Sequence, residues 1–267
     1  MSVLDGQAPP DEQVGPVEDV RDRGAFLPKW ARYLVTPGVV TASFLALYLY
    51  MSARDLGGIE RRVLTYPVIR ARTIEHIDIS FWATVIVLSL AIPTGIMLTR
   101  PWARRVTPLF VGLANIGQGV PSIGTFVLVF LILTRRGRYA AIIGLAIYAF
   151  LPVLRGTMVG LQQVPWEVIK AGRGMGLNRM QVLRQIELPL SVPILLTGVR
   201  TALVLTVSTA PLAAFVQGGT LGAIIITGFA QSRFTLVVTG SVLAAGLALL
   251  ADWAGGIAED QLRPRGL

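Results

Sequence analysis

Residues 175–193 read MGLNRMQVLRQIELPLSVP, a short polar segment enclosed by long apolar runs. Asn178 is a good helix N-cap, and Gln181 three residues later completes a capping box. From there, helical spacing turns polar side chains to one side of the segment and apolar side chains to the other. The apolar side holds Val182, Leu183 and Ile186. The stretch therefore predicts a short amphipathic helix that lies outside the lipid.

A second short helix is expected just upstream, so that segment 164–190 forms a hairpin. Pro165 suits a first helical position, and Glu167 lies near the positive end of that helix. Gly176 permits a tight turn between the two helices. Pro189 is expected to end the second helix, because the residue before a proline is pushed out of the α region. Such a hairpin suits docking into a partner's groove, and a surface hairpin without a partner is the alternative.

The remainder of the chain is too apolar for a soluble domain. Of its 267 residues, 53% are hydrophobic and 15% are charged, and the mean hydropathy is +0.64. A soluble domain carries roughly a quarter charged residues. About 20 apolar residues span a bilayer. Six apolar runs are about that long, or somewhat longer or shorter, and lie at 33–53, 79–99, 106–134, 139–154, 201–232 and 234–251. The sequence predicts an all-α polytopic membrane protein with about six transmembrane helices.

The charged and reactive residues exclude several classes of function. The net charge of +9 comes from arginines at the ends of apolar runs, which anchor helices at headgroups and do not indicate nucleic-acid binding. There is no cysteine for a disulfide or a thiolate metal site. Neither lysine, Lys29 or Lys170, lies in a phosphate loop, so the chain alone is not expected to hydrolyse ATP. The single histidine, His76, is expected at a helix end in contact with headgroups. These observations predict a protein that is not an enzyme.

Acidic residues are absent from 79–166 and from 188–251. Proton-coupled carriers usually keep an ionisable carboxylate inside the membrane, and the nearest candidates, Asp78 and Asp252, are expected at the interface. The sequence therefore disfavours a pump driven by its own carboxylates, while sodium-coupled or passive transport stays open.

Two of the apolar runs are not expected to form single straight helices. In 106–134, Pro121 and nearby glycines predict a break at membrane depth, where irregular backbone must be covered by protein or line a wet cavity. Two interpretations of this break carry equal weight. In one, polar side chains face a translocation pathway, and in the other the break is a packing kink. The candidates are Asn115, Gln118 and Ser122, next to Pro121. In 201–232, QGGTLG at 217–222 predicts a loop or re-entrant turn.

The chain is expected to divide into three parts. Residues 1–29 form a polar acidic tail without apolar periodicity, which predicts disorder. Residues 30–76 hold a first transmembrane helix and a linker along the interface. Residues 77–267 form the core, with the hairpin at 164–190.

Segment 174–189, GMGLNRMQVLRQIELP, resembles the signature cytoplasmic loop of ABC importer permeases. In that pattern a Glu-Ala-Ala triplet is followed by glycine, nine residues, a hydrophobic residue, any residue, and Leu-Pro. Gly176, Ile186, Leu188 and Pro189 match it. The resemblance extends to QGVPSIG, YAFLPVLRGTMVGLQQV, GVRTALVL, LAAFVQGGTLGAII and RPRGL. Together these stretches resemble permeases for glycine betaine, choline, carnitine and related osmoprotectants, over about 77–267.

The resemblance implies a type I importer permease with a methionine-importer-like core and an extra N-terminal helix. A second permease subunit, either another copy or a paralogue, completes the pathway. Two separate ATPase subunits bind ATP and Mg, and an extracellular binding protein with the cation–π cage delivers the solute. The chain itself holds no cofactor. It lies in a bacterial-type inner membrane with both termini cytoplasmic. In that topology the cytoplasmic segments hold somewhat more basic residues than the outer segments, which agrees weakly with the positive-inside rule. A permease for another solute, such as an amino acid or a thiolated betaine, and a passive channel are the alternatives.

The resemblance also assigns the residues that couple the permease to its ATPases. The Glu-Ala-Ala triplet aligns with Lys170, Ala171 and Gly172, so a lysine replaces the usual glutamate. Glu167, one helical turn earlier, is the candidate to substitute for that charge. The full coupling set consists of Lys170, Ala171, Gly172, Gly176, Val182, Leu183, Ile186, Leu188 and Pro189.

Overall fold

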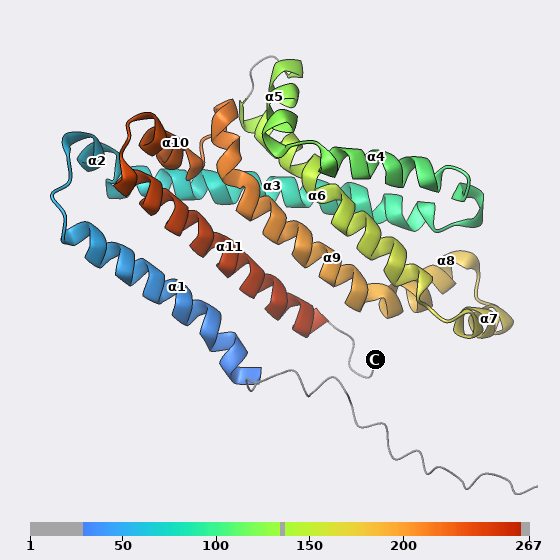
Figure 1. Cartoon of the computed structure of the whole chain (residues 1–267). Helices are drawn as coiled ribbons and strands as arrows, with labels where there is room; N and C mark the ends of the chain where they lie inside the picture. The colour runs from blue at the N-terminus through green and yellow to red at the C-terminus, as the bar shows by residue number, and fades with distance from the viewer. Residues whose placement is uncertain (1–28, 134–136, 263–267) are drawn as a thin grey trace, which may run out of the picture.

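The computed structural model describes residues 29–133 and 137–262, and within these ranges every regular element is helical (Figure 1). The predicted acidic tail, 1–29, lies outside the described residues except for its last residue. The all-α fold class is therefore confirmed, whereas the division into tail, first helix and core stays a prediction.

Six segments are long and apolar enough to cross a membrane when the bent pair α4–α5 is counted as one. The helices are α1 (Lys29–Ser52), α2 (Gly58–Val63), α3 (Tyr66–Leu98), α4 (Thr107–Gly119), α5 (Ser122–Ile132), α6 (Gly137–Gln162), α7 (Trp166–Gly174), α8 (Arg179–Val182), α9 (Leu188–Thr209), α10 (Gly222–Ala230) and α11 (Phe234–Leu262). Short 3-10 and π segments are η2 (Pro101–Ala103), η3 (Leu183–Glu187) and η4 (Ala210–Val216). The number of spans matches the prediction of about six.

Helix α6 lies at the centre of the bundle and packs most extensively against α9 and α3. Small residues allow the close approach to α9. A Cβ added to Gly198 of α9 would meet the carbonyl oxygen of Pro152 at 2.7 Å, and one added to Gly160 would meet the carbonyl oxygen of Ser191 at 2.9 Å. Apolar side chains such as Leu154 fill the space around this crossing. In a membrane, where lipid is as apolar as the protein, such close backbone packing is a main source of helix association.

Helix α3 begins well before the apolar run that predicted it. It starts at Tyr66, with Pro67 in its first turn, and the charged residues before Ile79 are helical. Arg72 and Glu75 form an ion pair of 2.8 Å within this part of the helix. An apolar run marks the length of helix that lipid covers, and the helix itself continues beyond that length. The linker between the first helix and the core is therefore shorter than the sequence suggested.

The predicted break at Pro121 is confirmed. Helices α4 and α5 meet at an angle of 102°. Val120, just before the proline, is extended with φ −67° and ψ 136°, as expected when a proline ring excludes the α conformation.

The chain also turns at 217–222, where the sequence predicted a loop or re-entrant turn. Segment η4 ends at Val216 and is followed by Gln217, which has φ 60°. The chain then passes through Gly219 and Thr220, with φ 77° and 67°, before α10 begins. The buried Thr220 hydroxyl donates to the carbonyl of Ala210 at 3.1 Å, which holds the turn against the preceding segment.

The first helix belongs to the same packed unit. α1 lies along α11 (Figure 1). The Tyr33 hydroxyl donates to Asp260 at 2.7 Å, and the Trp253 indole N–H donates to the Tyr33 carbonyl at 2.9 Å. A Cβ added to Gly246 of α11 would collide with Phe44, so this glycine allows α1 to approach closely.

The structure corrects the expectation for His76. Its side chain is fully buried, and Nε2 lies 2.9 Å from the carbonyl oxygen of Val207. Nearby, the hydroxyls of Thr84 and Thr206 are 3.0 Å apart. Because α3 extends past the apolar run, His76 lies inside the α3–α9 contact and does not face headgroups.

Candidate functional site

The hairpin predicted at 164–190 lies at one end of the bundle, between α6 and α9 (Figure 1). Its turn is a Schellman motif. The Gly176 N–H donates to the Arg173 carbonyl at 3.0 Å, and the Leu177 N–H donates to the Gly172 carbonyl at 3.2 Å. Gly176 has φ +87°, a conformation in which a side chain is strained. The turn therefore needs glycine at this position for conformational reasons.

The second helix of the hairpin begins with the predicted capping box. Asn178 Oδ1 accepts from the N–H groups of Met180 and Gln181 at 3.0 and 2.9 Å. In return, Gln181 Oε1 accepts from the Asn178 N–H at 2.8 Å. These bonds satisfy N–H groups that a helix start leaves without partners. The turn and the cap together hold the two hairpin helices in one geometry.

The apolar side of the second helix packs against α7. Val182 has no exposed surface, and Leu183 and Ile186 are half-buried. A Cβ added to Gly172 would collide with Ile186 Cδ1 and lie 3.8 Å from Val182 Cγ2. The predicted face is correct, but Val182 is enclosed within this chain and offers no surface to a partner. Gly172 is buried because it provides the space for these side chains.

The structure also corrects the expectation that Pro189 ends the helix. Segment η3 is a π-helical stretch, and the Leu188 N–H donates to the carbonyl of Leu183, five residues earlier. A proline ring clashes with the carbonyl four residues before it in a regular α-helix, and a wider turn relieves that clash. The chain therefore continues into α9, with Leu188 half-buried and Pro189 exposed. The second helix of the hairpin and α9 therefore form one continuous helical element, Arg179–Val216, and the coupling role of the hairpin stays a prediction.

An ion pair that the sequence did not reveal anchors this element. Arg100, at the end of α3, binds both carboxylate oxygens of Glu187, at 2.5 and 3.3 Å. The Glu187 side chain is 7% exposed and that of Arg100 is 27% exposed. A bidentate pair of this kind fixes the geometry of both groups. It joins the α8–α9 element to the α3 side of the bundle.

The outer surface of the hairpin is open and combines exposed apolar side chains with charged ones such as Glu167 and Arg173. Four large hydrophobic side chains are between 40% and 75% exposed there: Trp166, Val168, Met175 and Met180. Lys170 and Ala171 are exposed as well. The Arg173 guanidinium lies over the Trp166 ring, 5.5 Å from its centroid. Sequence periodicity pointed to the other side of the second helix, whereas these exposed residues come mainly from α7 and the turn.

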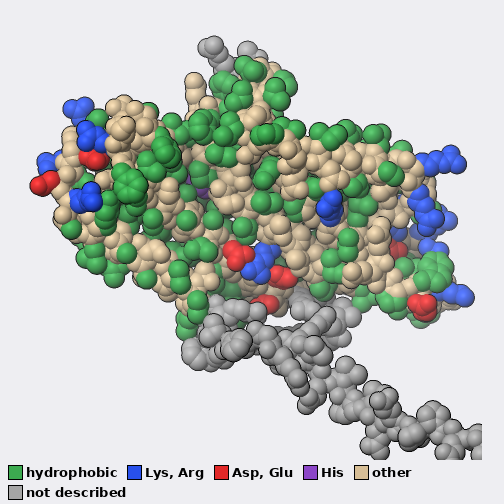
Figure 2. All heavy atoms as spheres, viewed as in Figure 1, with side chains coloured by type: hydrophobic (Ala, Val, Ile, Leu, Met, Phe, Trp, Pro, Cys, Tyr) green, Lys and Arg blue, Asp and Glu red, His purple; other side chains and the backbone are tan. Residues whose placement is uncertain are grey.

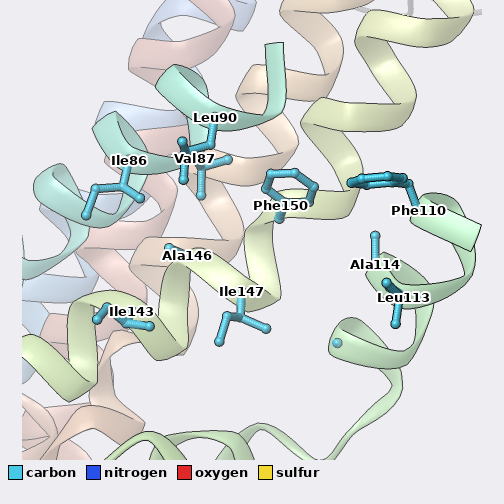
Figure 3. Close-up of a pocket in the computed structure, with 11 residues that line it drawn as sticks. Ile86, Val87, Leu90, Phe110, Leu113, Ala114, Ile143, Ala146, Ile147 and Phe150 are labelled. Carbon is cyan, nitrogen blue, oxygen red and sulfur yellow. The ribbon is translucent and has the colours of Figure 1, made fainter. Parts of the chain in front are cut away.

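The pathway candidates lie around the α4–α5 break. The Asn115 side chain accepts a hydrogen bond of 2.7 Å from Arg155 of α6. Gln118 and Ser122 are half-buried, and Pro121 is exposed. An adjacent hollow of about 420 Å³ between α3, α4 and α6 is lined by apolar residues, among them Phe110 and Phe150 (Figure 3). The polar candidates are not among the residues that line this hollow.

A second charged group lies between α9 and α11. Arg200 binds Asp252 through Nε and Nη2 at 2.8 and 2.9 Å, and its Nη1 lies 3.4 Å from Glu259. Asp252 lies within α11, which continues to Leu262, and its position at the membrane interface stays a prediction. Figure 2 shows most charged side chains at the two ends of the bundle, with a mixed acidic and basic group in the middle of this face. Within the described residues, no cluster of side chains suits a metal ion.

Comparisons with known proteins agree with this architecture. Residues 91–264 match the family described as "Binding-protein-dependent transport system inner membrane component". The carnitine transport permease protein OpuCB of Listeria monocytogenes is 35% identical over 73% of this chain and 88% of its own. The choline transport system permease protein OpuBB of Bacillus subtilis is 34% identical over 73% and 89%. The osmoprotectant import permease protein OsmY of Salmonella typhimurium is 33% identical over 67% and 75%.

Solved structures share the fold. A chain of the MetNI methionine ABC transporter, in an inward-facing conformation, superposes with a TM-score of 0.66 at 23% identity, covering 75% of this chain and 100% of its own. A chain of an amino acid ABC transporter gives a TM-score of 0.65 at 14% identity, covering 78% and 100%. The hairpin, the broken span and these matches together show that the chain belongs to the family of binding-protein-dependent transport system inner membrane components.

Proposed function

We propose that the chain is one of two permease subunits of an ATP-driven importer for osmoprotectants of the glycine betaine, choline and carnitine type. The observation that carries the proposal is the hairpin. It is held in one geometry by its Schellman turn and capping box, it exposes apolar side chains, and its second helix continues without a break into α9. The relatives named above as carnitine, choline and osmoprotectant permeases support the solute class.

In this proposal the hairpin docks into a groove on a separate ATPase subunit. Two such subunits bind ATP and Mg, and their closure moves the hairpins. Because the hairpin helix and α9 form one element, a displacement at Trp166 or Met175 reaches the membrane as a movement of α9. The pair Arg100–Glu187 transmits that movement to α3. The chain contributes no catalytic group, both termini are cytoplasmic, and an extracellular binding protein delivers the solute.

The decisive experiment is reconstitution. The purified chain alone is expected to show no ATP hydrolysis, because no phosphate loop is present in its sequence. Together with its ATPase, its partner permease and its binding protein in liposomes, it is expected to import glycine betaine or carnitine only when ATP is present. ATP turnover by the isolated chain, or uptake that does not depend on ATP, would contradict the proposal.

A further inference from the structure

Arg155 lies inside the candidate membrane span Gly137–Gln162, one residue beyond the apolar run 139–154 that predicted this span. It lies on α6, about 10 Å along the axis from the end of the helix at Gln162, at 1.5 Å per residue. Its partner Asn115 lies about 12 Å from the start of α4 at Thr107. Both side chains are exposed on the surface of the single chain. A charged and an amide group therefore share a surface below the hairpin end of the bundle.

The Arg155 guanidinium is not neutralised within the described part of the chain. It donates a hydrogen bond to the neutral Asn115 amide, and none of the ion pairs among the described residues includes it. Arg100, Arg138 and Arg200 each have a carboxylate partner. Moreover, α4, α5 and α6 contain no acidic residue at all. Of the two charged residues in these three helices, Arg138 is paired with Asp78, and Arg155 has no carboxylate partner among the described residues.

A charge within a membrane span does not face lipid at low cost, and such residues usually face a bundle interior or a water-filled cavity. Arg155 is next to the broken span, and irregular backbone in a membrane is also found where it lines a cavity. Asn115 and Gln118 lie one helical turn apart on α4, so they share a face with the Arg155 contact. These three side chains form a polar strip.

We infer that Arg155, held by Asn115, is a binding group for the carboxylate of the transported solute as it passes through the inner half of the pathway. The inference rests on the proposed function and narrows its solute class. Glycine betaine and carnitine carry a carboxylate beside the quaternary ammonium group, whereas choline carries none. A guanidinium binds a carboxylate through paired, charge-assisted hydrogen bonds and repels a cation. The strip therefore favours zwitterionic osmoprotectants over choline.

The first test compares solutes in the reconstituted complex. Arg155→Gln is expected to lower kcat/KM for glycine betaine uptake about 10- to 100-fold, the range for a lost hydrogen bond to a charged group. Asn115→Asp places a carboxylate beside Arg155 that competes with the solute for the guanidinium, so this variant is also expected to lower kcat/KM for glycine betaine uptake. Arg155→Lys keeps the charge and retains part of the activity. Arg138→Gln removes an arginine elsewhere and serves as the control. Better uptake of choline than of zwitterions by the wild type, or equal losses for both in Arg155→Gln, would overturn the inference.

A second test does not depend on the identity of the solute. In this cysteine-free chain, Gln118→Cys can be labelled with an anionic and with a cationic water-soluble thiol reagent. Arg155 is expected to favour the anionic reagent, and adding Arg155→Gln should lower the anionic-to-cationic rate ratio several-fold. An unchanged ratio would show that Arg155 faces lipid and would refute the inference. A complex that imports no osmoprotectant would instead refute the proposed function, while this ratio still reports on Arg155.

Discussion

Arg100 holds both oxygens of the Glu187 carboxylate, at 2.5 and 3.3 Å, across 87 residues of sequence. Glu187 is the last residue of the π segment that connects the hairpin to α9, and Arg100 follows the end of α3. The pair therefore joins the two parts of the bundle that must move together if the hairpin drives the membrane spans.

The burial of the two groups predicts an asymmetric response to mutation. Arg100→Gln leaves Glu187, at 7% exposure, without its charged partner and is expected to cost about 3 kcal/mol. Glu187→Gln leaves the more exposed Arg100 and should cost less. Thermal unfolding of the purified complex measures both. The exposed pair Arg138–Asp78 is the control, because its loss should cost within about 1 kcal/mol. Equal losses of stability from Arg100→Gln, from Glu187→Gln and from removal of the Arg138–Asp78 pair would contradict this account.

Gly176 is expected to be required for its backbone conformation and not for space. An added Cβ meets nothing within 4 Å, but φ is +87°, so Gly176→Ala should destabilise the hairpin by about 1 kcal/mol. Gly174→Ala is the matched control, because it too has open space but no positive φ. Gly176→Asp is expected to abolish ATP-driven uptake and weaken ATPase co-purification at wild-type expression. Normal uptake by that variant would show that the hairpin is not the coupling element.

Gly172 is expected to be required for space. A methyl group there collides with Ile186, so Gly172→Ala should cost about 1–3 kcal/mol through overpacking between the hairpin helices. Shortening the facing side chain with Ile186→Ala should recover part of that loss, so the double variant is more stable than the sum of the single effects predicts. Thermal unfolding and ATPase co-purification of the wild type, the two single variants and the double variant measure the interaction between the two positions. Simple additivity would mean that the two residues do not compete for the same space.

The pathway interpretation of the α4–α5 break predicts chemical access. Cysteines introduced singly at positions 118 to 122 should react with water-soluble thiol reagents, and the rates should change when the ATPases are trapped with ATP. Ala83→Cys, which replaces a fully buried residue, is the unreactive control. Uniform protection of positions 118 to 122 in every state would favour a packing kink.

The sequence by itself determined the features that depend on local chemistry. The number of spans follows from the lengths of the apolar runs, and the break follows from Pro121. The cap at Asn178 was also predictable, because its donors and acceptors lie within three residues of each other.

Only the tertiary structure decided which surfaces are covered and which charges meet. Helical spacing identified the side of the hairpin helix that carries Val182, but packing against Gly172 turned that side inward. The contacts of His76 with Val207 and of Arg155 with Asn115 join residues 131 and 40 positions apart. Such contacts depend on how helices pack side by side, and the periodicity of one helix does not show which other helix packs against it. Pro189 shows the same limit, since a π turn accommodates its ring within a helix that a local rule would end.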